Sequence, residues 1–142
     1  MAQAYEAIHV SEIPGPEYEK EADEPDWRPV RIHFDIRSFG TNAYVARAAG
    51  DRVITEHNET DENGTRHEEL YVVTSGHATF TVGGEQVDAP AGTFVYVPDP
   101  DTMRAAVARE EGTTVLCFGG TPGEAFKVSP WERKYEAQAR AG

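Results

Sequence analysis

Short stretches that alternate apolar and polar residues, or that are rich in β-branched residues, follow one another along most of the chain. Their spacing of roughly 8 to 12 residues is typical of a sandwich or barrel of antiparallel strands. Turn residues separate them: Ser75-Gly76 and Gly83-Gly84 supply the positive φ of tight hairpins. The predicted strands are Val30–Ile36, Thr41–Arg47, Arg52–His57, Glu69–Thr74, His77–Val82, Glu85–Asp88, Thr93–Val97, Met103–Val107 and Thr113–Phe118.

The two ends of the chain differ from this pattern. Residues 1–29 contain four prolines among Glu and Asp, which leaves little scope for a regular element and predicts an extended arm. At the other end, Ser129-Pro130 suits the start of a helix, and Trp131–Arg140 carries good helix formers. We therefore predict an acidic N-terminal arm (1–29), an all-β barrel (30–128) and a C-terminal helical tail (129–142).

Alternation along a strand also assigns side chains to faces. Glu69 and Tyr71 share one face of their strand. Along Met103–Val107, the face that bears Met103 is apolar and Arg104 points away from it, so we expect Met103 to face inward.

Charge and composition exclude several classes of protein. The net charge is −12, with eight acids among residues 1–27 against Lys20 alone. Because such a surface repels phosphate backbones, we expect no nucleic acid partner. No apolar run is long enough to span a membrane, and the N-terminal residues lack the pattern of a secretory signal, so a cytoplasmic location is expected. Cys117 is the single cysteine, which excludes an intrachain disulfide.

Two segments resemble the motifs of the cupin family, which are small barrels of jelly-roll type. Glu69 is followed by Gly76 at the spacing of the second half of the first cupin motif, and Gly92–Pro98 matches the start of the second motif. The resemblance implies a single cupin-type jelly-roll β-barrel. It also departs from the family, because Met103 stands where cupins place a metal-binding His.

The resemblance implies a metal site that this chain could retain in altered form. Cupins bind a transition metal through three His and one Glu. If Thr60–Gly64 is a loop insertion, His57 and Glu59 replace the usual His pair and face His67 and Glu69. Such a set could hold a divalent ion such as zinc, iron, manganese, nickel or copper. The alternative is structural: Glu69 is held by a neighbouring Arg or Tyr, and no ion binds.

Three functions remain open on this basis. The first is binding of a small molecule in the barrel, with Tyr44, Tyr71, Tyr96 and Met103 as its lining. The second is a metal-dependent cupin enzyme, an oxygenase or isomerase, that uses His57, His67 and Glu69. The third is a non-catalytic module that forms a homodimer through its arm and C-terminal helix. Fold alone does not select a reaction or identify catalytic residues.

Overall fold

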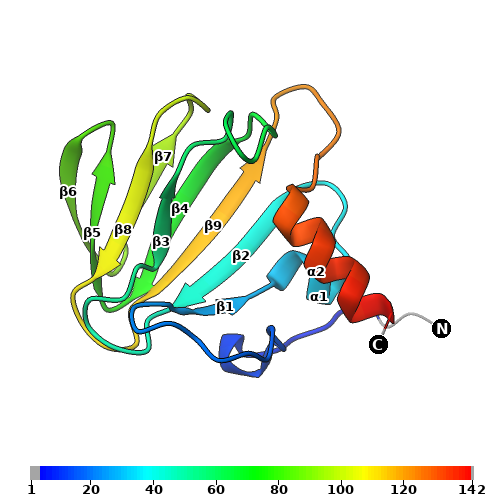
Figure 1. Ribbon diagram of the computed structural model, residues 1–142, viewed down its shortest axis with the longest axis horizontal. Helices are drawn as coiled ribbons and strands as arrows, with labels where there is room; N and C mark the ends of the chain where they lie inside the picture. Colours follow the sequence, from blue (N-terminus) through cyan, green and yellow to red (C-terminus); the bar gives the residue numbers. More distant parts are fainter. Residues whose placement is uncertain (1–3, 142) are drawn as a thin grey trace.

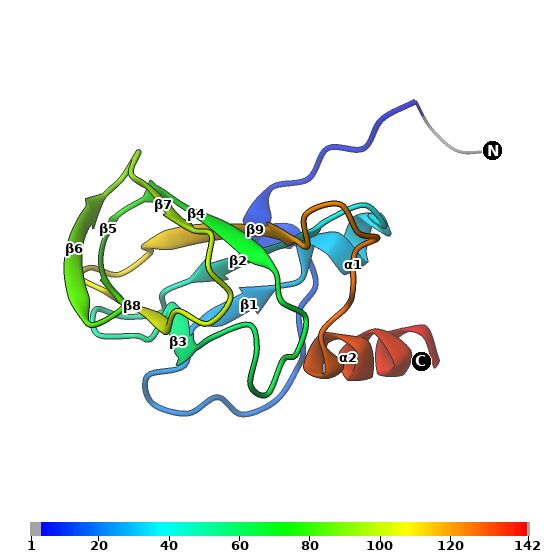
Figure 2. The same ribbon diagram turned by 90° about the horizontal axis from the view of Figure 1, so that it is seen from above.

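Two antiparallel sheets form the body of the molecule in the computed structural model, which describes residues 4–141. The five-stranded sheet has the order β1-β2-β9-β4-β7 and the four-stranded sheet the order β3-β8-β5-β6. Figures 1 and 2 show that the chain crosses repeatedly between them. The strands are β1 (Asp26–Arg28), β2 (Gly40–Val45), β3 (Ile54–His57), β4 (Glu68–Ser75), β5 (His77–Val82), β6 (Glu85–Pro90), β7 (Phe94–Val97), β8 (Arg104–Ala108) and β9 (Thr114–Gly120).

The core lies between the two sheets and confirms the all-β jelly-roll prediction. Tyr71 and Val73 of β4 meet Phe80 of β5 there, and all three side chains are buried. Alternation explains this, because the buried residues of β4 are every second one along the strand. Gly83 and Gly84 have φ values of 57° and 83°, which permits the tight β5–β6 hairpin that the sequence predicts.

One predicted strand is wrong. Val30–Ile36 contains the short helix α1 (Val30–Phe34), which follows Pro29 and ends at Asp35 in the left-handed conformation, with φ 56°. The β-branched residues of this stretch favour a strand locally, but tertiary contacts decide otherwise. Arg31 is buried, and its guanidinium donates to Glu132, 101 residues along the chain.

The C-terminal helix is confirmed as α2 (Pro130–Ala141). It lies at the end of the molecule that holds α1 and β1, away from the β5–β6 hairpin (Figure 1). Trp27 of β1 packs edge-on against Trp131 and Tyr135 of α2, at ring-centroid distances of 4.8 and 5.0 Å. These aromatic contacts and the ion pair of Arg31 dock α2 against the five-stranded sheet.

Part of the predicted arm is ordered into the fold. Its described residues, 4–29, contain the 3-10 turn η1 (Val10–Glu12) and the strand β1, which pairs with β2. Residues 4–9 extend away from the sheets (Figure 2), and Tyr5 is 78% exposed. The arm therefore adds an edge strand to the five-stranded sheet.

The faces of β8 are the reverse of the prediction. Arg104, Ala106 and Ala108 are buried, whereas Met103 is 41% exposed, so an inward-facing Met103 is wrong. Hydrophobicity favours Met inside and Arg outside. The opposite arrangement is stable here because Glu69 supplies a carboxylate to the buried guanidinium of Arg104.

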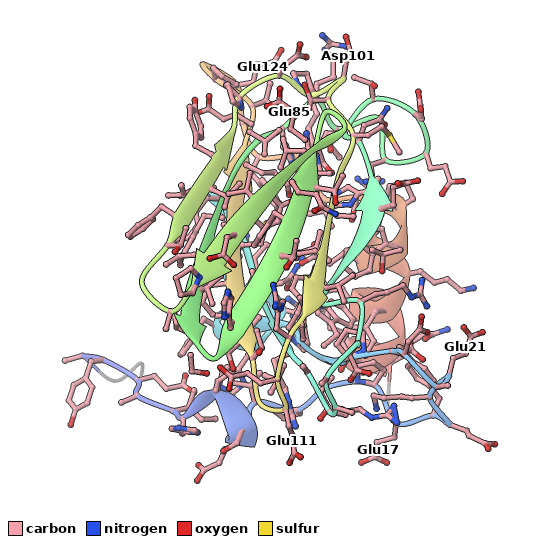
Figure 3. The ribbon with its side chains drawn as sticks, turned by 90° about the vertical axis from the view of Figure 1, so that its left-hand side faces the viewer. Glu17, Glu21, Glu85, Asp101, Glu111 and Glu124 are labelled. Carbon is pink, nitrogen blue, oxygen red and sulfur yellow. The ribbon has the colours of Figure 1, made fainter. Side chains whose placement is uncertain are left out.

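The excess negative charge lies at the surface. Figure 3 labels six acidic residues that point outward at opposite ends of the molecule, and all six are exposed: Glu17, Glu21, Glu85, Asp101, Glu111 and Glu124. Within residues 4–141, no helix has the length and apolar character needed to cross a bilayer.

Candidate ligand-binding site

A cavity of about 560 Å³ lies beside the five-stranded sheet and is bounded by α2 and by part of the N-terminal segment. Aromatic side chains form much of its wall: Tyr18, Trp27, Tyr44, Tyr71, Phe126, Trp131 and Tyr135. Four titratable residues also line it, and we call them the inner cluster: His57, Glu59, His67 and Glu69. The structure thus brings together all four residues that the sequence proposed as metal ligands.

Local structure explains why these residues converge. His57 ends β3, where the pairing with β8 shifts register. The loop that follows turns at Asn58, whose side-chain oxygen accepts from the backbone N–H groups of Thr60 and Asp61. Glu59 is then fixed by its backbone, because its N–H donates to Pro100 and its carbonyl accepts from Arg66. Residues 60–64 lie in the loop between β3 and β4, as the sequence predicts.

Glu69 is held from three sides. Arg104 Nη1 donates to Glu69 Oε1 at 2.6 Å, and the hydroxyl of Tyr71 donates to the same oxygen at 2.5 Å. Cys117 Sγ donates to Oε2 at 3.2 Å. The expected contact of Glu69 with a neighbouring Arg or Tyr is therefore present, and both residue types make it.

His57 joins the two carboxylates of the inner cluster. Its Nε2 lies 3.2 Å from Glu59 Oε2 and 3.4 Å from Glu69 Oε1, while its Nδ1 donates to the carbonyl of Thr55 at 2.7 Å. Burial alone would lower the pKa of His57, but the hydrogen bonds to Glu59 and Glu69 outweigh burial and raise that pKa to about 10. At neutral pH the imidazolium therefore neutralises one of the two carboxylates.

Two polar side chains donate hydrogen bonds to Glu59, and both histidines of the cluster lie beside it. Thr65 Oγ1 donates to its Oε1 at 2.9 Å, Asn63 donates to its Oε2 at 3.1 Å, and His67 Nδ1 lies 3.4 Å from Oε1. Burial would raise the pKa of Glu59, but His57, His67 and Thr65 stabilise the charged form and lower that pKa to about 2. For Glu69, burial likewise opposes ionisation, and the contact with His57 outweighs it, so its pKa is also lowered. Both carboxylates are ionised near neutral pH.

The donor set matches a divalent transition metal in number and type. His57 Nε2 and one oxygen from each of Glu59 and Glu69 lie within 4.8 Å of one another. The bond from His57 Nδ1 to Thr55 leaves Nε2 as the ligand atom, an arrangement common around metal-binding His. The guanidinium of Arg104 opposes an ion, because it already neutralises Glu69 at 2.6 Å. His67 lies outside this three-atom set.

Two of the four predicted lining residues lie at the cavity. Tyr44 and Tyr71 contribute to its wall. Tyr96 is 56% exposed on β7, where it donates to Glu68, and Met103 is exposed beside β8; neither lines the cavity. Tyr96 is paired with Leu70, which precedes Tyr71 in β4 and faces the opposite side of the sheet. Because paired residues share a face, Tyr96 points away from the cavity.

Sequence reasoning missed most of the wall. Trp27, Phe126, Trp131 and Tyr135 come from the predicted arm, a loop and the C-terminal helix, which the strand pattern does not connect. A large aromatic residue in an otherwise acidic, proline-rich arm was the available signal for Trp27. Arg104 was missed because its buried position depends on a carboxylate that lies 35 residues away in the sequence.

Comparison with known proteins identifies the type of domain. Residues 52–136, more than half of the chain, match the family model of the AraC-like ligand binding domain. No curated protein sequence matches the chain.

Solved structures with the same fold include several cupins. A sugar phosphate isomerase of the cupin superfamily from Silicibacter pomeroyi has a TM-score of 0.62 at 17% identity, covering 82% of this chain and 77% of its own. A variant of Streptomyces PAC13, solved with uridine, has a TM-score of 0.57 at 17% identity, covering 92% and 88%. KdgF from Halomonas has a TM-score of 0.55 at 16% identity, covering 80% and 88%. At such low identity the similarity shows the fold alone.

Proposed function

The chain belongs to the family of AraC-like ligand binding domains, a family of cupin type, and on that premise we propose that it binds a small organic molecule in the cavity. The observation that supports this most is the cavity itself. Its volume of about 560 Å³ lies within the range of about 300–1,000 Å³ for small-molecule sites. It also combines a largely aromatic wall with a few polar groups that converge from different elements.

The charges of the inner cluster favour a ligand that is neutral overall. Glu59 is balanced by the imidazolium of His57, and Glu69 is balanced by Arg104. A bound anion would meet two carboxylates, and a bound cation would compete with charges that are already paired. A ligand with hydrogen-bond donors can still use the carboxylate oxygens. One structural neighbour, the PAC13 variant, was solved with uridine, a small neutral polar molecule.

Thermal unfolding in the presence of a metabolite library tests the proposal. A ligand that binds only the folded protein raises Tm. At a ligand concentration of one hundred times Kd, the free energy of unfolding increases by about 2.7 kcal/mol. We expect this stabilisation to fall strongly in His57→Gln, which removes the group that joins Glu59 and Glu69. His77→Gln is the matched control, because His77 pairs with Asp88 on β6, away from the cavity. The proposal fails if no compound raises Tm.

A metal-dependent function is a second candidate, supported by the three ligand atoms within 4.8 Å. Metal content after purification without chelator tests it. If an ion binds there, Glu69→Gln should abolish near-stoichiometric metal, whereas the adjacent Glu68→Gln should not. Glu68 is the appropriate control because it bonds to Tyr96 rather than to the inner cluster. Metal below a tenth of the protein concentration in the unmodified chain would contradict this candidate.

Homodimer formation remains a proposal. The arm and α2 were its expected contacts, and segments of both line the cavity of their own chain through Tyr18 and Tyr135. Residues 4–9 extend from the sheets (Figure 2), and apart from the contact of Glu6 with His33 they are the part of the arm that we propose meets a second copy. The mass in solution of a chain lacking residues 1–9 tests this role: a dimer that persists unchanged would exclude these residues from the interface.

A further inference from the structure

Four residues that line the cavity each carry a buried side-chain polar atom with no hydrogen-bond partner within residues 4–141. The atoms are Trp27 Nε1, Asn42 Oδ1, His67 Nε2 and Ser129 Oγ. Among the described residues one further side-chain atom of this kind occurs, Arg28 Nε, and Arg28 does not line the cavity. Since buried polar groups in proteins are nearly always paired, the concentration of unpaired ones around one cavity indicates that they serve a bound molecule.

These atoms differ in what they demand of a partner. The indole of Trp27 can only donate. The unpaired atom of Asn42 is its side-chain carbonyl oxygen, which can only accept. His67 has Nδ1 3.4 Å from Glu59 Oε1, so Nε2 is the ring nitrogen that is left without a partner among the described residues.

Ser129 is unpaired at a position where a serine hydroxyl is normally hydrogen-bonded. It immediately precedes α2, where a serine hydroxyl normally accepts from a backbone N–H of the first turn. Here the hydroxyl makes no such bond, and Ser129 is 8% exposed. It can both donate and accept, so it places no restriction on the sign of the partner.

Resting on the proposed function, we propose that this wall binds a neutral ligand group that both donates and accepts hydrogen bonds, a hydroxyl or a carboxamide. An ammonium group cannot accept from Trp27, and an anion that carries no hydrogen cannot donate to Asn42. A hydroxyl or a carboxamide can both accept from Trp27 and donate to Asn42. The aromatic packing of Trp27 on Trp131 and Tyr135, and the buried ion pair between Arg31 and Glu132, hold the wall in position before binding.

The indole N–H of Trp27 gives a direct readout in a ¹H–¹⁵N correlation spectrum of the full chain. The chain has two Trp residues, so Trp131→Phe assigns the two indole signals. Titration uses xylitol as the hydroxyl probe, nicotinamide as the carboxamide probe, tetramethylammonium as the cation and sulfate as the anion. We expect xylitol or nicotinamide to shift the Trp27 indole signal with saturation, and tetramethylammonium and sulfate to leave it in place; which neutral probe acts identifies the group.

Two variants test the roles of the individual atoms. Ser129→Ala removes a polar atom that has no protein partner, so the ligand-free protein should keep its Tm or gain slightly. Trp27→Phe removes such an atom too, but it also reduces the packing on Trp131 and Tyr135, so its Tm should fall. Each should nevertheless weaken binding of the active probe about tenfold, the loss of one neutral hydrogen bond. Ser75→Ala, which removes an exposed hydroxyl at the end of β4, should leave the affinity unchanged.

The inference is overturned if neither neutral probe shifts the Trp27 signal, or if Trp27→Phe and Ser129→Ala bind the active probe as tightly as the unmodified chain. Saturable binding of tetramethylammonium or sulfate at this wall would also overturn it. Binding of such an ion would leave the proposed function intact, since a small molecule would still occupy the cavity. The proposed function fails separately, through the library measurement of Tm.

Discussion

Replacing Arg104 by Met should destabilise the protein more than most single substitutions. The guanidinium is completely buried, and it donates to Glu69 Oε1 at 2.6 Å, to the carbonyl of Thr102 at 2.9 Å and to that of Asp99 at 3.2 Å. Met has a similar length and fills much of the same space. The variant therefore removes the charge and the donors with limited loss of packing.

The expected magnitude follows from what the substitution leaves behind. Glu69 remains buried and ionised without its guanidinium, and removing one partner of a buried ion pair typically costs about 3–5 kcal/mol. For a chain of 142 residues this corresponds to a fall in Tm of roughly 10–15 °C. Adding Glu69→Gln to Arg104→Met should recover part of the loss, because the uncompensated charge is then removed.

Urea denaturation measures the free energy of unfolding, and a thermal scan measures Tm independently. Arg109→Met is the matched control: Arg109 follows β8, is exposed, and makes only a 3.4 Å contact with Thr79, so its loss should cost under about 0.5 kcal/mol. If Arg104→Met costs less than about 1 kcal/mol, or if the double variant is no more stable than Arg104→Met, the buried-pair reasoning is refuted.

Three further outcomes are expected. The free energy of unfolding should be highest between roughly pH 4.5 and 6.5. The pKa of His57 rises from 6.5 to about 10 on folding, so its stabilising contribution is complete below pH 6.5 and is lost as pH rises toward 10. The pKa of Glu59 falls from 4.5 to about 2 on folding, so its stabilising contribution is lost as pH falls from 4.5 toward 2. Urea midpoints across pH measure this, and an alkaline decline that is equally steep in His57→Gln would contradict it. Arg31→Met should lower the free energy of unfolding by about 3 kcal/mol and accelerate proteolysis of residues 121–129, because it leaves a buried Glu on α2 unpaired. The control variant Arg37→Met replaces an exposed side chain and should be cleaved at the original rate. Met103→Ser should change stability by under about 0.5 kcal/mol and leave ligand-induced stabilisation intact; a clear loss of either would restore an inward role for Met103.

Strand prediction succeeded where the signals are local. The strand His77–Val82 has the predicted bounds, because alternation of side chains and the two glycines that follow it lie within a few residues of one another. It failed at Val30–Ile36, where a buried ion pair with α2 supports a helix that the β-branched residues do not predict. Local preference is worth tenths of a kcal/mol per residue, which one buried ion pair can override.

The sequence predicts which residues form the inner cluster, but it does not predict their charges or their chemistry. The spacing from Glu69 to Gly76 resembles a cupin motif, and this directed attention to His57, Glu59 and His67. The partners that determine its electrostatics, Arg104 above all, approach from other strands. Whether a carboxylate is free to bind a ligand depends on those partners, so its pKa and its chemistry are properties of the assembled site.

The sequence by itself determined that this chain forms antiparallel strands with a helix at its end, because period, turn residues and helix start signals act between residues that are close along the chain. Only the tertiary structure decided that Arg104 lies inside and Met103 outside, since the stability of a buried charge depends on a partner from a distant strand. It alone also placed Trp27, Asn42, His67 and Ser129 around one cavity. These four positions span about a hundred residues, and no short-range pattern connects them.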